Sequence, residues 1–420
     1  MYNFDRERLA LESASGGKNT LILDDVGLPS VMVRIPKCRW SDIVAGGPDT
    51  TCSAFIIDGV EHDEIFISKY HNVVEGGRAY SIAGRDPAAF MNIDQAKQYC
   101  EAKGDNWHLL TNAEYMLLAH WCKTNGTMPH GNNYCGRDID HKWEHGVKSY
   151  DWLVNYNWNN LADSFDGTNY HHTGRTLTGS GPASWYHDGT TFGVDGLNGN
   201  VWDWCAGMRV QSGEIQIIPD NNAAKHIDQS ATSTLWKAIL QDGSLVAPGT
   251  ANTLKYNSDT AGNNSQTANR TGAPILDTVN DKPAYTGGVV NDDYGYMDEA
   301  FETLTAKSGV TVPQILKNLG LFPVGSSLGG DYFGVRNYGE RLPVRGGSWI
   351  NGAGAGVFNL NLSISRALSA DDVGFRSRST GFHMLTLLRM LKRNGLYANR
   401  SLSLTAIKSC SLPAITNTTL

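Results

Sequence analysis

The most informative part of the sequence runs from Arg345 to Arg376. It opens with Arg345-Gly346-Gly347-Ser348-Trp349 and closes with Gly374-Phe375-Arg376. Between these two anchors, residues 350–372 contain no Lys, Glu, Gln, Met or Trp, although all five occur elsewhere in the chain. Within this tract, Asn359-Leu360-Asn361-Leu362 alternates polar with apolar residues, as a half-buried strand does. We therefore expect two rigid anchors around a compositionally unusual tract.

The composition is that of a folded, loop-rich protein. Of 420 residues, 40% are hydrophobic and 18% are charged, while 46 glycines and 11 tryptophans indicate many turns and large aromatic anchors. The formal net charge of −7, without a cluster of Lys and Arg before residue 389, argues against nucleic acid as a partner. No stretch approaches the roughly 18 apolar residues of a membrane span, so we expect no membrane insertion. The charged N-terminus does not resemble a signal peptide.

Cysteine and histidine give no regular metal-ligand spacing. Seven cysteines are scattered without the C-x-x-C pairs of a zinc site, so we expect reduced and mostly buried thiols. His120 falls on the apolar face of an expected helix and is interpreted as a packed side chain. The remaining histidines considered as ligands lack a recognisable spacing: His130, His141, His145, His171, His172 and His187. Residues 163–167 and 291–294 offer clustered oxygens for calcium, but neither matches an EF-hand loop, and turn formation explains both.

Local signals predict the first half of the chain. Residues 1–20 are polar and are interpreted as a flexible entry or a short docking arm. A hairpin is expected from strands at 21–23 and 31–35, followed by strands at 54–57 and 64–70. Asn92 with Gln95, and Thr111 with Glu114, have capping spacing, which predicts helices over 93–102 and from 112 to about 123. Residues 125–200 are expected to form a long ordered loop region.

The second half has weaker signals. Trp202-Asp203-Trp204 follows an Asn-Gly turn and predicts a core strand. Residues 206–285 are expected to hold one strand at 213–218 within an irregular excursion. Helices are expected at 298–307 and 312–317, with Pro313 in the first turn of the latter. Residues 382–393 predict an amphipathic basic helix, and 400–420 a poorly ordered end.

The order of these motifs resembles the formylglycine-generating enzyme superfamily, whose fold is a variant of the C-type lectin fold. The resemblance rests on Ile67-Ser68-Lys69-Tyr70, Asn92-Ile93-Asp94-Gln95-Ala96, Leu109-Leu110-Thr111-Asn112-Ala113-Glu114-Tyr115, Gly199-Asn200-Val201-Trp202-Asp203-Trp204 and the two anchors. It covers roughly residues 50–378. It implies an α+β fold, loop-rich, with short strands and two main helices.

The resemblance also suggests a division of the chain. Residues 1–50 would be an N-terminal strand and hairpin segment, and residues 51–380 the lectin-type domain. That domain would carry an insert at about 206–335 and a variable region at 345–378. Residues 381–420 would form a C-terminal extension.

In the enzymes of this superfamily, a copper-bound cysteine pair lies between the two anchors. Here the interval has no cysteine, and the nearest are Cys205 and Cys410. Thiolates are the nucleophiles and metal ligands of that chemistry, so we expect no oxidase activity and no catalytic residues. The ergothioneine-forming branch would need an iron-binding histidine set, which the sequence lacks. We expect no cofactor, and a structural calcium is left open.

The tract itself resembles the variable region of a diversity-generating retroelement variable protein. In that family, adenine-directed reverse transcription rewrites Asn (AAC) codons, and changes at the first two bases cannot yield Lys, Glu, Gln, Met or Trp. The resemblance implies these varied, ligand-contacting positions: Ile350, Asn351, Gly354, Asn359, Asn361, Ser363, Ile364, Leu368, Ala370, Asp371 and Asp372. It implies these scaffold positions: Trp202, Trp204, Arg345, Gly346, Gly347, Trp349, Gly374, Phe375 and Arg376. Trp349 and Trp202 are expected to support ligand contact.

The resulting expectation is a hypervariable receptor-binding protein that recognises a host cell-surface protein or glycan. Without a signal peptide, it would be a phage tail-tip or fibre protein in the virion tail, or otherwise cytoplasmic. Trimerisation is frequent in the family, so a homotrimer is expected, and other virion tail proteins are expected as partners. The alternatives are an enzyme of the same superfamily, a calcium-dependent sugar-binding lectin, although the E-P-N and W-N-D motifs are absent, and a small-residue loop selected only for tight turns.

Overall fold

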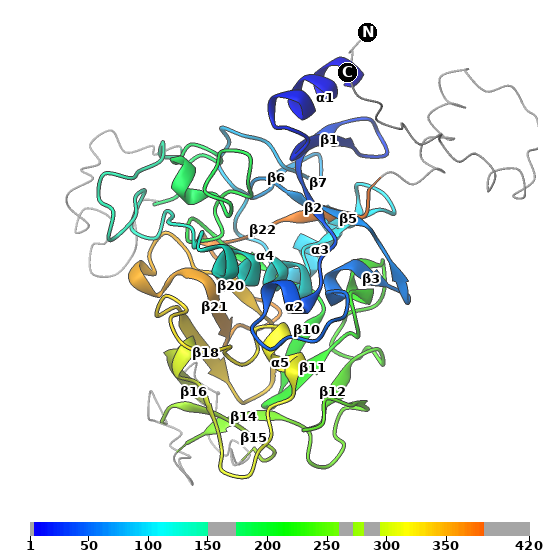
Figure 1. The fold of residues 1–420 in the computed structure, drawn as a ribbon, viewed down its shortest axis with the longest axis vertical. Coiled ribbons are helices and arrows are strands. Elements are labelled where there is room, and N and C mark those ends of the chain that lie inside the picture. The colour runs from blue at the N-terminus through cyan, green and yellow to red at the C-terminus, as the bar shows by residue number, and fades with distance from the viewer. Residues whose placement is uncertain (1–3, 150–173, 260–271, 281–294, 382–420) are drawn as a thin grey trace, which may run out of the picture. The chain divides into compact units, whose positions relative to one another are not determined.

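The structure is a computed structural model that describes residues 4–149, 174–259, 272–280 and 295–381 (Figure 1). Residues 1–381 form one compact unit. The expected calcium segments at 163–167 and 291–294, His171 and His172, and the C-terminal segments 382–393 and 400–420 lie outside the described residues. Over the described ranges, no helix has the length and apolar character needed to cross a membrane.

The described ranges contain five α-helices: α1 (Phe4–Ala14), α2 (Trp40–Ile43), α3 (Ile93–Glu101), α4 (Asn112–Asn125) and α5 (Gln314–Asn318). Both predicted capping boxes are confirmed. The Asn92 Oδ1 atom accepts from the Gln95 amide at 2.9 Å, and the Thr111 Oγ1 atom accepts from the Glu114 amide at 3.2 Å. These bonds satisfy amides that the first helical turn leaves open, so the start of each helix is encoded locally.

Helix α1 corrects the expectation of a flexible entry. Its sequence is rich in Arg, Leu, Ala and Glu, which favour helix. None of its residues is buried, but the Thr20 hydroxyl donates to Glu12 at 2.7 Å and ties the helix to the first strand. The helix therefore depends on propensity and this tether rather than on an apolar face.

A five-stranded sheet contains both the N-terminal hairpin and the strand that follows the closing anchor. Its strands, in spatial order, are β1 (Asn19–Leu23), β2 (Pro29–Pro36), β5 (Glu64–Ser68), β23 (Ser377–Ser379) and β8 (Trp107–Leu109). The predicted hairpin is confirmed, because β1 pairs antiparallel with β2. Strand β23 lies between β5 and β8, so residues at both ends of the unit share one sheet.

A six-stranded sheet collects the motif strands. In order, it contains β16 (Tyr296–Ala300), β18 (Tyr332–Arg336), β21 (Gly356–Leu362), β20 (Val344–Gly346), β9 (Trp202–Trp204) and β22 (Val373–Phe375). The predicted strands at 202–204 and 359–362 are confirmed. The opening anchor pairs with β9 on one side, and the closing anchor pairs with β9 on the other. The middle Trp-Asp-Trp strand thus fixes the distance between the two anchors.

The segment 206–285, which was expected to be an irregular excursion with one strand, instead contributes several strands to an eight-stranded sheet. The path is β13 (Leu245–Val246), β12 (Lys237–Ile239), β11 (Glu214–Ile217), β14 (Lys255–Ser258), β15 (Pro274–Asp277) and β17 (Thr305–Ala306), and β10 (Met208–Gln211) joins β11 to β19 (Glu340–Arg341). Only β11 was predicted. The helix expected at 298–307 is wrong, since residues 298–300 belong to β16, which pairs with β18, and the 3-10 turn η5 (Phe301–Thr303) and β17 follow. Long-range pairing overrides the helical propensity of this Asp- and Glu-containing segment. Helix α5 confirms the one expected at 312–317.

Short elements complete the described chain. Two small hairpins are β3 (Ile56–Ile57) with β4 (Val60–Glu61), and β6 (Val73–Glu75) with β7 (Arg78–Tyr80). The 3-10 turns are η1 (Ser53–Phe55), η3 (Ala183–Trp185), η4 (Asn222–Ala224), η5 (Phe301–Thr303) and η6 (Gly352–Gly354). Within 125–200, the described parts are mostly irregular, as the sequence predicts.

Helix α4 lies at the centre of the compact unit (Figure 1). His120 is buried on this helix, and its Nε2 atom lies 3.1 Å from both the Lys317 and the Asn318 carbonyl oxygens. Its ring meets Phe358 of β21 edge-on, with centroids 5.7 Å apart. The interpretation of His120 as a packed side chain is confirmed, and its packing joins α4 to the strand inside the tract.

Candidate functional site

The tract between the anchors begins where the β20–β21 ladder breaks. Arg345 faces Leu360, but the next residue, Gly346, faces Gly356, so the register shifts and residues 347–355 leave the sheet. Gly347 adopts φ +79°, and a Cβ atom there would lie 2.6 Å from the Cβ atom of Ala355. A side chain at this position would collide with the returning chain. The glycine of the opening anchor is therefore a geometric requirement of the connection.

A buried carboxyl group outside the tract supports the irregular start of β21. The Asp331 Oδ2 atom accepts from the Phe358 amide at 2.7 Å. Gly356 leaves room for this contact, because a Cβ atom there would lie 2.1 Å from the Asp331 Oδ1 atom. Burial raises the pKa of Asp331 well above its usual range. Where the ladder breaks, the Phe358 amide thus finds its hydrogen-bond acceptor in Asp331, which lies outside the tract, rather than in a side chain of the tract.

Buried arginines hold both anchors. The Arg345 Nε atom donates to Asn112 at 2.7 Å, and its Nη2 atom donates to the Gly320 carbonyl at 3.0 Å. The Arg376 guanidinium donates to the Asp203 carboxylate at 2.7 Å and to the Gly196 carbonyl at 2.6 Å. A planar guanidinium with several donors can join distant backbone and side-chain acceptors at once. These contacts tie each anchor to the surrounding fold independently of residues 350–372.

All nine predicted scaffold residues are buried: Trp202, Trp204, Arg345, Gly346, Gly347, Trp349, Gly374, Phe375 and Arg376. Trp349 is 1% exposed and Trp202 is 5% exposed. Both indoles pack inside the protein, so any support they give to ligand contact would be indirect, through the packing beneath the tract.

The predicted varied residues divide by exposure. Ile350 and Asn351 are exposed, and Asn359 is completely buried. The others are partly exposed: Gly354, Asn361, Ser363, Ile364, Leu368, Ala370, Asp371 and Asp372. Asn359 is therefore wrong as a ligand-contacting position in this conformation. Its Nδ2 atom donates to the Gly354 carbonyl at 2.6 Å, which places it in the support of the connection.

Hydrogen bonds between side chains join the two surface segments of the tract. The Ser348 hydroxyl donates to Asn351 at 2.8 Å and lies 2.9 Å from the Asp372 Oδ2 atom. Burial raises the pKa of Asp372. The 350–354 connection and the end of the 363–372 loop consequently lie side by side, although they are far apart in the sequence of the tract.

Arg366 anchors the middle of the 363–372 loop and is absent from the predicted site residues. Its Nε and Nη2 atoms each lie 2.9 Å from a Glu340 carboxylate oxygen, and its Nη1 atom donates to Asp94 at 2.7 Å. Its Nη2 atom also donates to the Gln229 carbonyl at 3.0 Å. Arg366 is the only charged residue between positions 350 and 370, and this isolated charge is the feature of the sequence that could have indicated its role.

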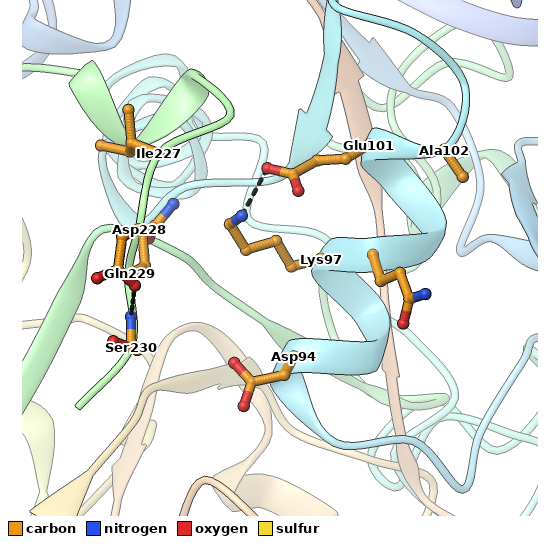
Figure 2. Close-up of a pocket in the computed structure, with 9 residues that line it drawn as sticks. Asp94, Lys97, Glu101, Ala102, Ile227, Asp228, Gln229 and Ser230 are labelled. Carbon is orange, nitrogen blue, oxygen red and sulfur yellow. Dashed lines mark hydrogen bonds and ion pairs between the residues drawn. The ribbon is translucent and has the colours of Figure 1, made fainter. Parts of the chain in front are cut away.

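A groove of about 390 Å³ opens beside this arginine, between α3 and residues 227–230 (Figure 2). Asp94 and Gln229 both line the groove and both bind Arg366. Figure 2 shows Lys97 reaching toward Glu101 along the helix, and their charged atoms lie 2.6 Å apart. The groove is lined mainly by polar side chains, and it extends the surface of the loop toward α3.

Phe90 is a second surface residue that the sequence did not reveal. It is 65% exposed and adopts φ +58°, a left-handed conformation that is unusual for a bulky side chain. Its amide donates to the Ala370 carbonyl at 2.8 Å, so it lies directly beside the loop. An exposed aromatic group held in a strained backbone next to the tract is a candidate ligand contact.

The described histidines of the loop region have structural partners. In the described part of the chain, no three His, Cys, Asp or Glu side chains come together as a metal site. His130 and His141 stack with centroids 3.7 Å apart, and each binds a carboxylate at 3.0 Å. Buried His187 accepts from the Val194 amide at 2.7 Å. These contacts tie the three rings to neighbouring parts of the loop region.

Neither a family model nor a curated protein matches the chain. Among solved structures, it is similar to Treponema denticola variable protein 1, with a TM-score of 0.28 and 11% sequence identity. The similarity covers 86% of this chain and 99% of that chain. A likeness at this level carries no argument about fold or function.

Proposed function

We propose that this chain is a ligand-binding protein whose 350–372 tract is diversified by a retroelement, on a lectin-type scaffold of the formylglycine-generating enzyme kind. The proposal rests on one observation: residues outside the tract hold its backbone, while side chains within the tract lie at the surface. Asp331, Arg345 and Arg376 hold the backbone around the tract from fixed positions. Ile350 and the partly exposed loop side chains remain available at the surface. A preorganised backbone limits the entropy lost when such side chains bind.

The proposed ligand surface consists of the 350–354 connection, the 363–372 loop and the adjoining Phe90. A host cell-surface protein or glycan is the proposed ligand. A phage tail tip or fibre is the proposed setting, with a homotrimer and other tail proteins as proposed partners. Ser348 links the two segments through Asn351 and Asp372, so one ligand could touch both.

The direct test is the DNA that flanks the coding region. We expect a near-copy of the codons for 345–378 that differs at template adenines and lies beside a reverse transcriptase gene. A complete genome without such a repeat would contradict the retroelement part of the proposal.

A protein-level test uses two matched libraries. One randomises Ile350, Ser363, Ile364, Leu368 and Asp371 with codons derived from AAC, and the other does the same at Val357, Phe358, Leu360, Leu362 and Val373. The second set is buried, so most of its members should fail to fold. Most members of the first library should remain soluble and protease-resistant. Equal loss in both libraries would argue against a display surface.

Two other functions remain to be tested. An enzyme of the same superfamily would carry copper or iron, and stoichiometric metal in the purified protein would support it over our proposal. A calcium-dependent lectin would lose ligand binding on addition of a chelator. Our proposal predicts binding that survives chelation.

A further inference from the structure

Cys38 lies just after β2, opposite Cys52, which directly precedes η1. Their Sγ atoms are 3.6 Å apart, and the Cys52 amide donates to the Cys38 carbonyl at 3.0 Å. Arg39 and Thr51, one residue further into the loop, form an antiparallel bridge. Directly opposed residues in antiparallel chains have Cα atoms about 4.5–5.5 Å apart, within the roughly 4.4–6.8 Å that a disulfide spans. The backbone is thus already arranged for a disulfide.

Other described thiols have different surroundings. The Cys122 Sγ atom donates to the His187 carbonyl at 3.3 Å, and the Cys205 Sγ atom lies 3.6 Å from the Asp203 carbonyl oxygen. Both of these cysteines are buried, whereas Cys38 is partly exposed. A small oxidant can therefore reach Cys38 directly.

We propose that Cys38 and Cys52 form a disulfide when the protein enters an oxidising environment. With a small-molecule disulfide as oxidant, the Cys38 thiolate attacks one oxidant sulfur and releases the first small thiol. Cys52 then attacks the Cys38 sulfur of this mixed disulfide, and its proton leaves with the second small thiol. The two protein thiols lose two electrons and two protons, and the oxidant is reduced to two thiols.

The new bond would close residues 39–51 into a covalent loop. This loop contains α2, where the Trp40 ring is buried against His120 of α4 with centroids 6.2 Å apart. The Thr124 hydroxyl of α4 donates to the Ile43 carbonyl at 2.8 Å. A cross-link restricts the unfolded chain, and here it would favour the state in which α2 is docked on the central helix. The proposal does not depend on the proposed ligand surface.

The test titrates the purified full chain in glutathione buffers from fully reduced to fully oxidised. Digestion without reductant, followed by mass spectrometry, should yield a peptide pair linked through Cys38 and Cys52, about 2 Da lighter than the sum of the free peptides. The oxidised protein should melt at least about 2 °C above the reduced protein. Free Cys38 and Cys52 in oxidised glutathione, or linkage of either to another cysteine, would overturn the proposal.

Variants separate this bond from general oxidation. C38S and C52S should each abolish the difference in melting temperature between the oxidised and reduced samples. C122S, which removes a thiol outside the pair, should retain that difference. If C52S does not fold, the peptide map of the unmodified chain decides the question without it. A difference that persists in C38S would contradict the assignment.

Discussion

The Arg376 Nε atom lies 2.7 Å from the Asp203 Oδ2 atom, and neither side chain is appreciably exposed. This pair joins the closing anchor to the central Trp-Asp-Trp strand. Burial alone would raise the pKa of Asp203, but the positive charge of Arg376 lowers it. The aspartate is therefore held ionised inside the protein, where removal of its charge would leave Arg376 uncompensated.

Asp203→Asn should destabilise the protein by about 3–5 kcal/mol, because it leaves a buried guanidinium without its counter-charge. The measurement is the free energy of unfolding from urea titration. Asp58→Asn is the matched control, since Asp58 and Lys225 form an exposed pair at 2.5 Å. That change should cost no more than about 1 kcal/mol. Similar losses in both variants would contradict a special role for the buried pair.

Gly374→Ala should cost about 1–3 kcal/mol of stability through overpacking. A Cβ atom at Gly374 would lie 2.6 Å from the Val201 Cγ2 atom and 2.8 Å from the Ala88 carbonyl oxygen. Gly354→Ala is the control, because its Cβ atom would lie 3.4 Å from Tyr332 and requires little movement. Thermal unfolding of both variants distinguishes the anchor glycine from the proposed varied one. Equal melting temperatures would contradict the prediction.

Phe90→Gly should stabilise the protein by about 1 kcal/mol, because glycine relieves the left-handed backbone strain at little cost in packing. Phe90→Leu keeps a Cβ atom and should give no such gain. Urea unfolding measures both. If the proposed function is correct, Phe90→Gly should also weaken ligand binding while Phe90→Leu weakens it less. A loss of stability in Phe90→Gly would show that the ring contributes packing that exceeds the strain.

Stability should fall as the pH decreases from about 6.5 to about 4. Burial lowers the pKa of His120 from 6.5 to about 4, despite two carbonyl oxygens that favour its protonated form. The unfolded chain binds a proton at this position near pH 6.5, whereas the folded protein does not until about pH 4. Acid therefore favours the unfolded state in this window. His120→Gln should show a shallower decline in urea-unfolding free energy, and an unchanged slope would contradict the assignment.

Arg366→Ala should loosen the 363–372 loop. Loss of its contacts to Glu340, Asp94 and Gln229 removes charge-assisted hydrogen bonds worth about 1.5–3 kcal/mol each in favourable cases. Limited proteolysis should cut within the loop sooner than in the unmodified chain. Arg366→Lys should restore only part of the protection, because lysine lacks the planar donor fork. Full protection in Arg366→Lys would indicate that charge alone holds the loop.

The sequence determined the features that depend on neighbouring residues. The caps at Asn92 and Thr111, the β1–β2 hairpin and the presence of a strand at β21 follow from local hydrogen bonding and side-chain periodicity. The unusual composition of 350–372 is likewise a property of the sequence by itself, and it marks the tract as a candidate site. These signals placed α3, α4, several strands and the candidate site along the chain.

Which side chains of the tract reach the surface depends on contacts between distant segments of the chain. Asn359 looks like its neighbour Asn361 in the sequence, yet it is buried, because the ladder breaks after Arg345 and turns its side chain toward Gly354. Phe90 and Arg366 join the surface through partners far away in the chain. The eight-stranded sheet was missed for the same reason. Strand pairing and burial arise from contacts between distant segments, and no local pattern specifies them.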